Sequence, residues 1–437
     1  MKNRIRLRVH ACASFGVWLS LLLGWTLTAA GAVHVDACAS GFGNGSHLFP
    51  YKTLTQAVAE AAAGSNLSVQ SAAYPERLTI TKNLKLEASG GRVLIGTHAV
   101  KTAEICVPVM DHEQLPLEDP ISCGSDPIGV HAKLYYPAVG PDGLSMACAG
   151  PFPLIVYAHG RRASYQALCD GSNPGPVHED YREADGILTW LAAAGIIVIS
   201  VDVSAGPTPI EKASIMMNTV SYACAESARR GSLLQGAVDP QRIGLLGHSQ
   251  GGAAAIRAAA CLNGNSATSL DLPKVDVLAV GLLAPALWQV ESDVDGVGGA
   301  ALVIYGTNDE HPLQVGDDPL EVYGSLAPPK HLVVVEGANH FGYTDGICLA
   351  DDDYASTVGG LDGPAAQQLQ QLTARRNIRA FFSSYLLGDS AQLDYLVQES
   401  GEQCGHPGNP PACGIPKRHF EDLENLGVNI RVCSCVP

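Results

Sequence analysis

The sequence RIGLLGHSQGGAAAIRAAA occupies residues 242–260 and carries the clearest structural signal in the chain. Its first five residues are typical of a buried strand, and its alanine-rich end favours a helix. Between them lies a G-x-S-x-G motif, and the order strand, sharp turn, helix predicts a nucleophile elbow at Ser249. We expect a positive φ at Ser249, and glycine at 247 and 251 because side chains there would collide with the neighbouring strand and helix. An incidental serine in a glycine-rich turn is the alternative.

The residues on either side of the elbow alternate between apolar runs and helical patterns. This alternation predicts an α/β fold with a mostly parallel sheet covered by helices on both faces. An edge strand that ends in proline is expected over 129–137. The expected buried strands are 154–158, 196–201, 242–246, 275–280, 301–305 and 332–335, and the expected helices are 180–194, 214–231 and 365–387.

Three polar residues follow predicted strands in the order Ser249, Asp309, His340. The carboxyl ends of parallel strands meet at one edge of a sheet, so these side chains are expected to converge. A serine hydroxyl needs a base to become a nucleophile, which His340 would supply. Asp309 would fix the imidazole tautomer and stabilise the imidazolium.

With these motifs, residues 125–390 resemble a secreted α/β-hydrolase of the dienelactone-hydrolase and polyester-hydrolase type. The segment Ala338-Asn339-His340-Phe341 is similar to the histidine loop of that group. The resemblance implies an acyl-enzyme esterase without a cofactor. It also implies that the oxyanion is bound by the backbone N–H groups of Gln250 and Arg161.

Other assignments stay open from the residues alone. The base could be His248, His311 or His331, and the acid could be Glu310, Asp317 or Asp318. His159 is expected to orient a loop. The pair Arg161-Arg162 is expected to pair with acidic groups rather than to attract an anionic substrate. The run 351–353 of three aspartates is expected to be a solvated turn rather than a calcium site, and no metal site is predicted.

The N-terminus indicates export. Residues 1–32 combine a basic start, an apolar stretch and a small-residue cleavage site after Ala32, as in a secretory signal peptide. An uncleaved anchor is the alternative. Of 13 cysteines, Cys12 lies in this segment, and the twelve others predict several disulfides in a secreted or periplasmic protein. The net charge of −16 argues against nucleic acid and anionic membranes as partners.

Two further segments flank the expected hydrolase domain of residues 105–395. Residues 33–104 contain a helix at 55–63 and short alternating runs at 67–70, 78–80, 84–86 and 93–96, which are expected to be strands. They resemble the start of a pectate-lyase-like right-handed β-helix, in Thr53-Leu54, Tyr74-Pro75-Glu76 and Gly90-Gly91 among others. Residues 396–437 are expected to form a cysteine-rich tail, with disulfides rather than zinc.

Three functions fit the sequence. The first is a secreted serine hydrolase that cleaves small or polymeric carboxylic esters. The second is a peptidase of the prolyl-oligopeptidase type, although about 60 residues of short strands cannot supply its propeller. The third is a non-catalytic protein that binds a surface or polysaccharide. The sequence leaves the ester's identity, the disulfide connectivity and the oligomeric state undetermined.

Overall fold

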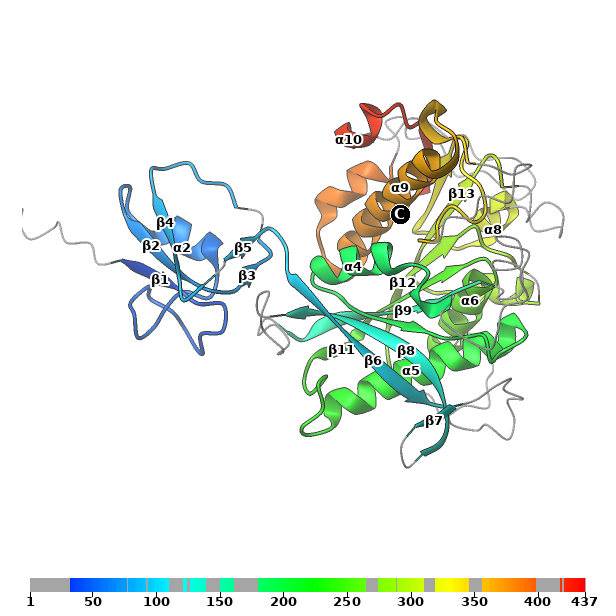
Figure 1. Ribbon diagram of the computed structural model, residues 1–437, viewed down its shortest axis with the longest axis horizontal. Helices are drawn as coiled ribbons and strands as arrows, with labels where there is room; N and C mark the ends of the chain where they lie inside the picture. The colour runs from blue at the N-terminus through cyan, green and yellow to red at the C-terminus, as the bar shows by residue number, and fades with distance from the viewer. Residues whose placement is uncertain are drawn as a thin grey trace, which may run out of the picture. The chain divides into compact units, whose positions relative to one another are not determined.

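The computed structural model divides into two compact units, residues 1–96 and 97–437, and each is described by itself (Figure 1). Within the described residues, no helix combines the length and the apolar character needed to cross a membrane. Arg161, Arg162, Glu310, His311, Asp317, Asp318 and the run 351–353 lie outside the described residues. The described residues are 32–76, 78–91, 93–109, 121–123, 126–138, 150–160, 180–264, 274–287, 289–309, 319–345, 356–397, 417–418 and 420–436.

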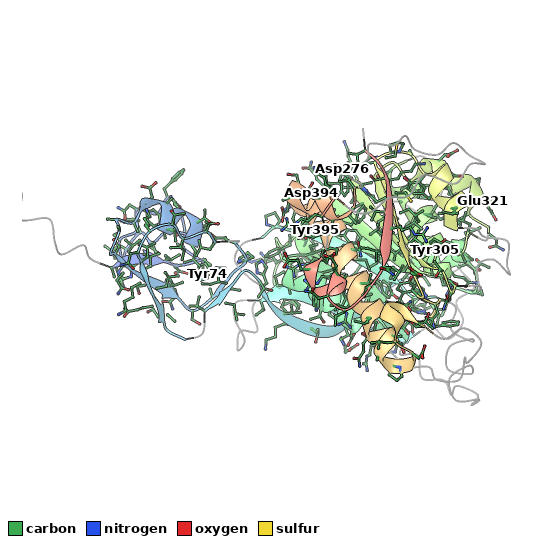
Figure 2. All side chains as sticks on the ribbon, turned by 90° about the horizontal axis from the view of Figure 1, so that it is seen from above. Tyr74, Asp276, Tyr305, Glu321, Asp394 and Tyr395 are labelled. Carbon is green, nitrogen blue, oxygen red and sulfur yellow. The ribbon has the colours of Figure 1, made fainter. Side chains whose placement is uncertain are left out.

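The N-terminal unit contains two small parallel sheets and one helix. Strands β1 (Val33–Val35), β2 (Asn66–Gln70) and β4 (Lys85–Ser89) form one sheet, and β3 (Ala73–Tyr74) and β5 (Leu94–Ile95) form the other. Helix α2 (Leu54–Glu60) begins after Thr53, whose hydroxyl accepts a hydrogen bond from the N–H of Gln56. The buried Tyr74 donates its hydroxyl to the carbonyl of Gln70 (Figure 2).

The strand predicted at 78–80 is wrong. These residues lie on the connection between β3 and β4 and pair with no strand among the described residues. Ile80 is largely exposed there. Alternation over three residues therefore marks a corner of this unit, because a strand needs a neighbouring strand to pair with as well as a pattern.

The second unit is built on one mixed, mostly parallel sheet, which confirms the predicted α/β class. The order is β15 (Ile430–Cys435), β14 (Lys330–Val335), β13 (Ala300–Gly306), β12 (Val277–Leu283), β11 (Val238–His248), β9 (Phe152–Ala158), β10 (Ile197–Val201), β8 (Asp126–Ala138) and β6 (Ala99–Pro108), with β7 (Ile121–Cys123) on β8. The strands from β9 to β14 pair with one another in parallel, whereas β6, β7, β8 and β15 pair antiparallel with their neighbours. The strand predicted at 129–137 is therefore present as β8, but it lies between β10 and β6 and is not an edge strand.

Helices cover both faces of this sheet (Figure 1). Helices α5 (Pro209–Ala228) and α6 (Gln250–Leu262) pack on one face, and α4 (Asp185–Ala193) and α9 (Gly363–Leu387) pack on the other. The side chains of β9 alternate between the two faces: Leu154 and Val156 join the first core, while Ile155 and Tyr157 join the second. A strand buried on both faces must be apolar throughout, which explains the continuous apolar run.

The C-terminal segment contributes a strand that the sequence did not predict. Residues 430–435 form β15, which pairs antiparallel with β14 along its whole length. Earlier in the chain, the ring of Tyr395 stacks on that of Phe420 at 4.1 Å between centroids, and Asp394 lies 3.2 Å from Lys417. Figure 2 labels Asp394 and Tyr395. Cys38, Cys106, Cys433 and Cys435 each take part in a disulfide. The end of the chain is therefore part of the sheet that carries the candidate site.

Candidate active site

Ser249 occupies a strained turn between β11 and α6. Its backbone has φ 54° and ψ −122°, which confirms the predicted positive φ. A Cβ added at Gly247 would lie 2.0 Å from the carbonyl oxygen of Gly251, and one at Gly251 would lie 2.2 Å from that of Ala158. Both positions therefore require glycine, because the helix crosses β11 and the neighbouring strand β9 at backbone contact. Strain of this kind at a polar residue is typical of functional sites.

The segment that follows β9 lies directly beside Ser249. A Cβ at Gly160 would come within 3.1 Å of the Cβ of Ser249 and 3.4 Å of Nδ1 of His248. Gln250 is the first residue of α6, and the first N–H groups of a helix have no acceptor within the helix. Ser249 therefore lies next to the N–H of Gln250 at the start of α6 and next to Gly160, which follows β9. Arg161, the other predicted donor, follows Gly160 and lies outside the described residues.

Asp309 and His340 are paired. The Nδ1 atom of His340 lies 3.1 Å from both carboxylate oxygens of Asp309, and both side chains are almost completely buried. A carboxylate accepts hydrogen bonds, so Nδ1 carries the hydrogen and, in the neutral ring, Nε2 carries the lone pair. This arrangement leaves Nε2 able to take a proton.

The loops after β13 and β14 touch through their backbones. The N–H of Asn308 donates to the carbonyl of Ala338 at 2.9 Å, and that of Thr307 donates to Val335 at 3.1 Å. A Cβ at Gly306 would lie 2.0 Å from the same Ala338 oxygen, so only glycine allows this approach. The close contact between the loops explains how Asp309 and His340, 31 positions apart, form a hydrogen-bonded pair.

His248 lies within the site but not as a free base. Its Nε2 lies 2.9 Å from the carbonyl oxygen of His340, so Nε2 donates a hydrogen bond there. Its ring centroid is 5.1 Å from that of His340, which places the imidazole of His340 next to the residue that precedes Ser249. His331 packs elsewhere: its ring contacts the carbonyl of Leu396 and the hydroxyl of Tyr385. Burial lowers the pKa of His331 to about 4.

Glu183 is a charged residue of this region that the sequence did not single out. One oxygen accepts from the hydroxyl of Tyr157 at 2.9 Å and lies 3.6 Å from Nδ1 of His248. Burial raises the pKa of Glu183, but the contact with His248 outweighs it, and the pKa lies below its usual value. Its position before α4 gave no signal in the sequence, because no strand ends at Glu183.

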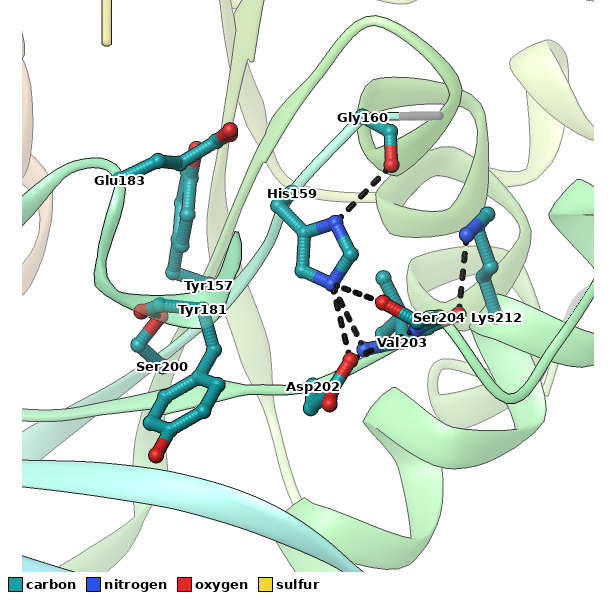
Figure 3. A network of polar contacts seen from close by, with 10 residues as sticks. All are labelled: Tyr157, His159, Gly160, Tyr181, Glu183, Ser200, Asp202, Val203, Ser204 and Lys212. Carbon is teal, nitrogen blue, oxygen red and sulfur yellow. Dashed lines mark hydrogen bonds and ion pairs between the residues drawn. The ribbon is translucent and has the colours of Figure 1, made fainter. Parts of the chain in front are cut away.

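A second buried network surrounds His159, the residue after β9 (Figure 3). Its Nδ1 contacts the carbonyl of Gly160 at 2.9 Å, and its Nε2 accepts from the N–H of Val203 at 3.0 Å. Asp202 lies 3.3 Å from the same Nε2 and accepts from the N–H of Ser204. Burial raises the pKa of Asp202, yet the contacts with His159 and Ser204 lower it to about 2. His159 therefore joins the loops after β9 and β10, in agreement with the predicted orienting role.

Asp202 could have been found in the sequence, since it directly follows the strand β10 as Ser249 follows β11. Its contacts place it in the loop network rather than next to Asp309 and His340. Among the described residues, no group of three or more histidine, cysteine or acidic residues could hold a metal ion.

A comparison with the curated proteins gives no match. A family model described as PETase: PET hydrolase-like matches residues 183–349. This range begins at Glu183 and contains Ser249, Asp309 and His340. Over these residues the chain is therefore similar to a family of α/β-hydrolases that hydrolyse polyesters.

Proposed function

We propose that the protein is a serine esterase that forms an acyl-enzyme on Ser249. The Oγ atom of Ser249 attacks the ester carbonyl carbon while its proton passes to Nε2 of His340. The tetrahedral intermediate collapses, and the leaving alkoxide takes the proton from His340. Water, deprotonated by the same imidazole, then attacks the acyl group and releases the acid and free Ser249. Asp309 holds the tautomer and stabilises the imidazolium in both halves.

One observation carries this proposal. Asp309 fixes the imidazole of His340, and the backbone carbonyl of His340 accepts a hydrogen bond from His248. His248 is the residue directly before the strained Ser249. A base with the correct tautomer is thus tied to the elbow of the serine. Neither a glycine-rich turn nor an idle scaffold requires such a combination of strain, burial and pairing.

The oxyanion would be bound by the N–H groups of Gln250 and of Arg161. Gln250 supplies a helix N-terminal donor immediately after the nucleophile. The close approach of Gly160 to Ser249 supports the second donor, because the next N–H in the chain is that of Arg161. Two donors, one from the N-terminus of α6 and one from the segment after β9, would surround the developing charge.

The substrate class follows from the matched family. We propose that polymeric esters are substrates, because the family is named for PET hydrolysis. An insoluble polymer must be met outside the cell. This agrees with export to the medium or periplasm, which the signal-like residues 1–32 and the disulfide-bonded cysteines support.

A chromogenic ester panel, followed by a polyester film, tests the proposal. We expect the wild type to turn over esters and to be labelled by a serine-reactive fluorophosphonate. Ser249→Ala should lose both the ester turnover and the labelling. The matched control is Ser325→Ala, an exposed serine at the end of α8 (Pro319–Ser325), which should retain both activities. Equal turnover in the wild type and Ser249→Ala would refute the assignment of the nucleophile. Turnover of peptides but not esters would refute the reaction class.

A further inference from the structure

The side chains of Glu183, which is partly buried, and His248, which is buried, lie next to the proposed triad without being part of it. The side chain of His248 is 4% exposed and that of Glu183 is 13% exposed. A buried polar group is costly unless it is paired, so their placement requires an explanation. The esterase mechanism as described uses neither of them.

Both ring nitrogens of His248 face acceptors. Nε2 lies 2.9 Å from the carbonyl oxygen of His340 and must donate, since a carbonyl can only accept. Nδ1 has no hydrogen-bond partner among the described residues, and a carboxylate oxygen of Glu183 lies 3.6 Å from it. The ring therefore lies between two oxygen acceptors, the carbonyl of His340 and the carboxylate of Glu183.

The groups around this ring come from three parts of the fold. Glu183 precedes α4, His340 and Tyr343 belong to the loop after β14, and Gly160 lies just after β9. Tyr157 reaches Glu183 from β9, with its hydroxyl 2.9 Å from the carboxylate. The ring thus connects the nucleophile strand to the loop that carries the base.

From this geometry we propose that Glu183 and His248 are positioning residues for the base. Glu183 orients the His248 ring, and the ring fixes the carbonyl of His340 and so the direction of its imidazole. The inference depends on the proposed esterase function of Ser249, Asp309 and His340. Its consequence is that the residue between Gly247 and Ser249 influences kcat through the base rather than through contact with the ester.

Four variants test the proposal through the separation of kcat from KM. His248→Phe fills the space without a donor, and its kcat should fall about tenfold with KM unchanged, as expected for one lost hydrogen bond that orients the base. His248→Gln keeps an N–H near the position of Nε2 and should restore most of kcat. Glu183→Gln should lower kcat about threefold to tenfold. Glu321→Gln, an exposed glutamate of α8, is the control that leaves kcat unchanged.

The double variant decides between a pair and two independent residues. Glu183→Gln should lower kcat in the wild type but add nothing in the His248→Phe background, because the ring through which it acts is absent. Thermal unfolding of each variant shows whether it is folded. If His248→Phe does not fold, the comparison of Glu183→Gln with His248→Gln supplies the test instead. A wild-type kcat in His248→Phe, or additive losses of kcat in the double variant, would overturn the positioning role and leave the proposed esterase function standing. A wild type inactive on every ester would overturn the proposed function and this inference together.

Discussion

Gly251→Ala should separate helix α6 from strand β9 and so disable the site. An added Cβ would lie 2.2 Å from the carbonyl oxygen of Ala158 and 2.6 Å from that of His159, both backbone atoms. Real Cβ contacts are not shorter than 3.0 Å, so the helix and the strand must move apart by at least 0.8 Å, the difference between 2.2 and 3.0 Å. Overpacking of this kind costs about 1–3 kcal/mol of unfolding free energy. A shift approaching 1 Å at Ser249 should lower kcat/KM by about a hundredfold.

Denaturant unfolding and ester turnover, measured on the same preparations, check both numbers. The control is Gly324→Ala in α8, where an added Cβ meets nothing within 4 Å. In a helix this change should be neutral or stabilise by up to about 1 kcal/mol. If Gly251→Ala unfolds at the same denaturant concentration as the wild type and retains its kcat/KM, the close packing argued for the elbow is refuted.

Two further predictions concern charge. Asp309→Asn should lower kcat by about a hundredfold to ten-thousandfold because the tautomer of His340 is no longer fixed, and a kcat within threefold of the wild type would contradict its role. Burial lowers the pKa of His98 to about 4 from 6.5, so its contribution to stability is complete above pH 6.5 and is lost as pH falls toward 4. His98→Leu should therefore lose less unfolding free energy over that range than the wild type, by at most about 3 kcal/mol, and an unchanged pH dependence would count against it.

The elbow could be predicted because its requirements are local. Gly247, Ser249 and Gly251 stand at fixed spacing, and the turn needs glycine wherever the backbones meet. The long apolar runs were predictable for a related reason, since a strand buried on both faces must be apolar at every position. Strand β15 could not be predicted, because an antiparallel strand at the edge of a sheet needs a neighbour to pair with but no continuous apolar run. Its sequence IRVCSC has the composition of a disulfide-rich tail.

The pairing of Glu183 with His248 was beyond the sequence for a different reason. The two residues are 65 positions apart, and their contact depends on how α4 packs against the sheet. A glutamate outside any motif is usually solvated, so its type alone predicts nothing. The resemblance of residues 33–104 to a β-helix stays a prediction, as do the predicted domain boundaries.

The histidine loop shows why a recognisable motif does not by itself give an active site. The side chain of Gln370 on α9 accepts from the N–H of Asn339 at 3.1 Å and donates to its carbonyl at 2.7 Å. On the other side, the hydroxyl of Thr307 accepts from the N–H of Gly337 at 2.9 Å, and His248 holds the carbonyl of His340. The loop is thus fixed by α9, by the segment after β13 and by β11. The direction of the imidazole is therefore a property of the packed sheet, and losing any one of these contacts should reduce kcat before it reduces binding of the ester.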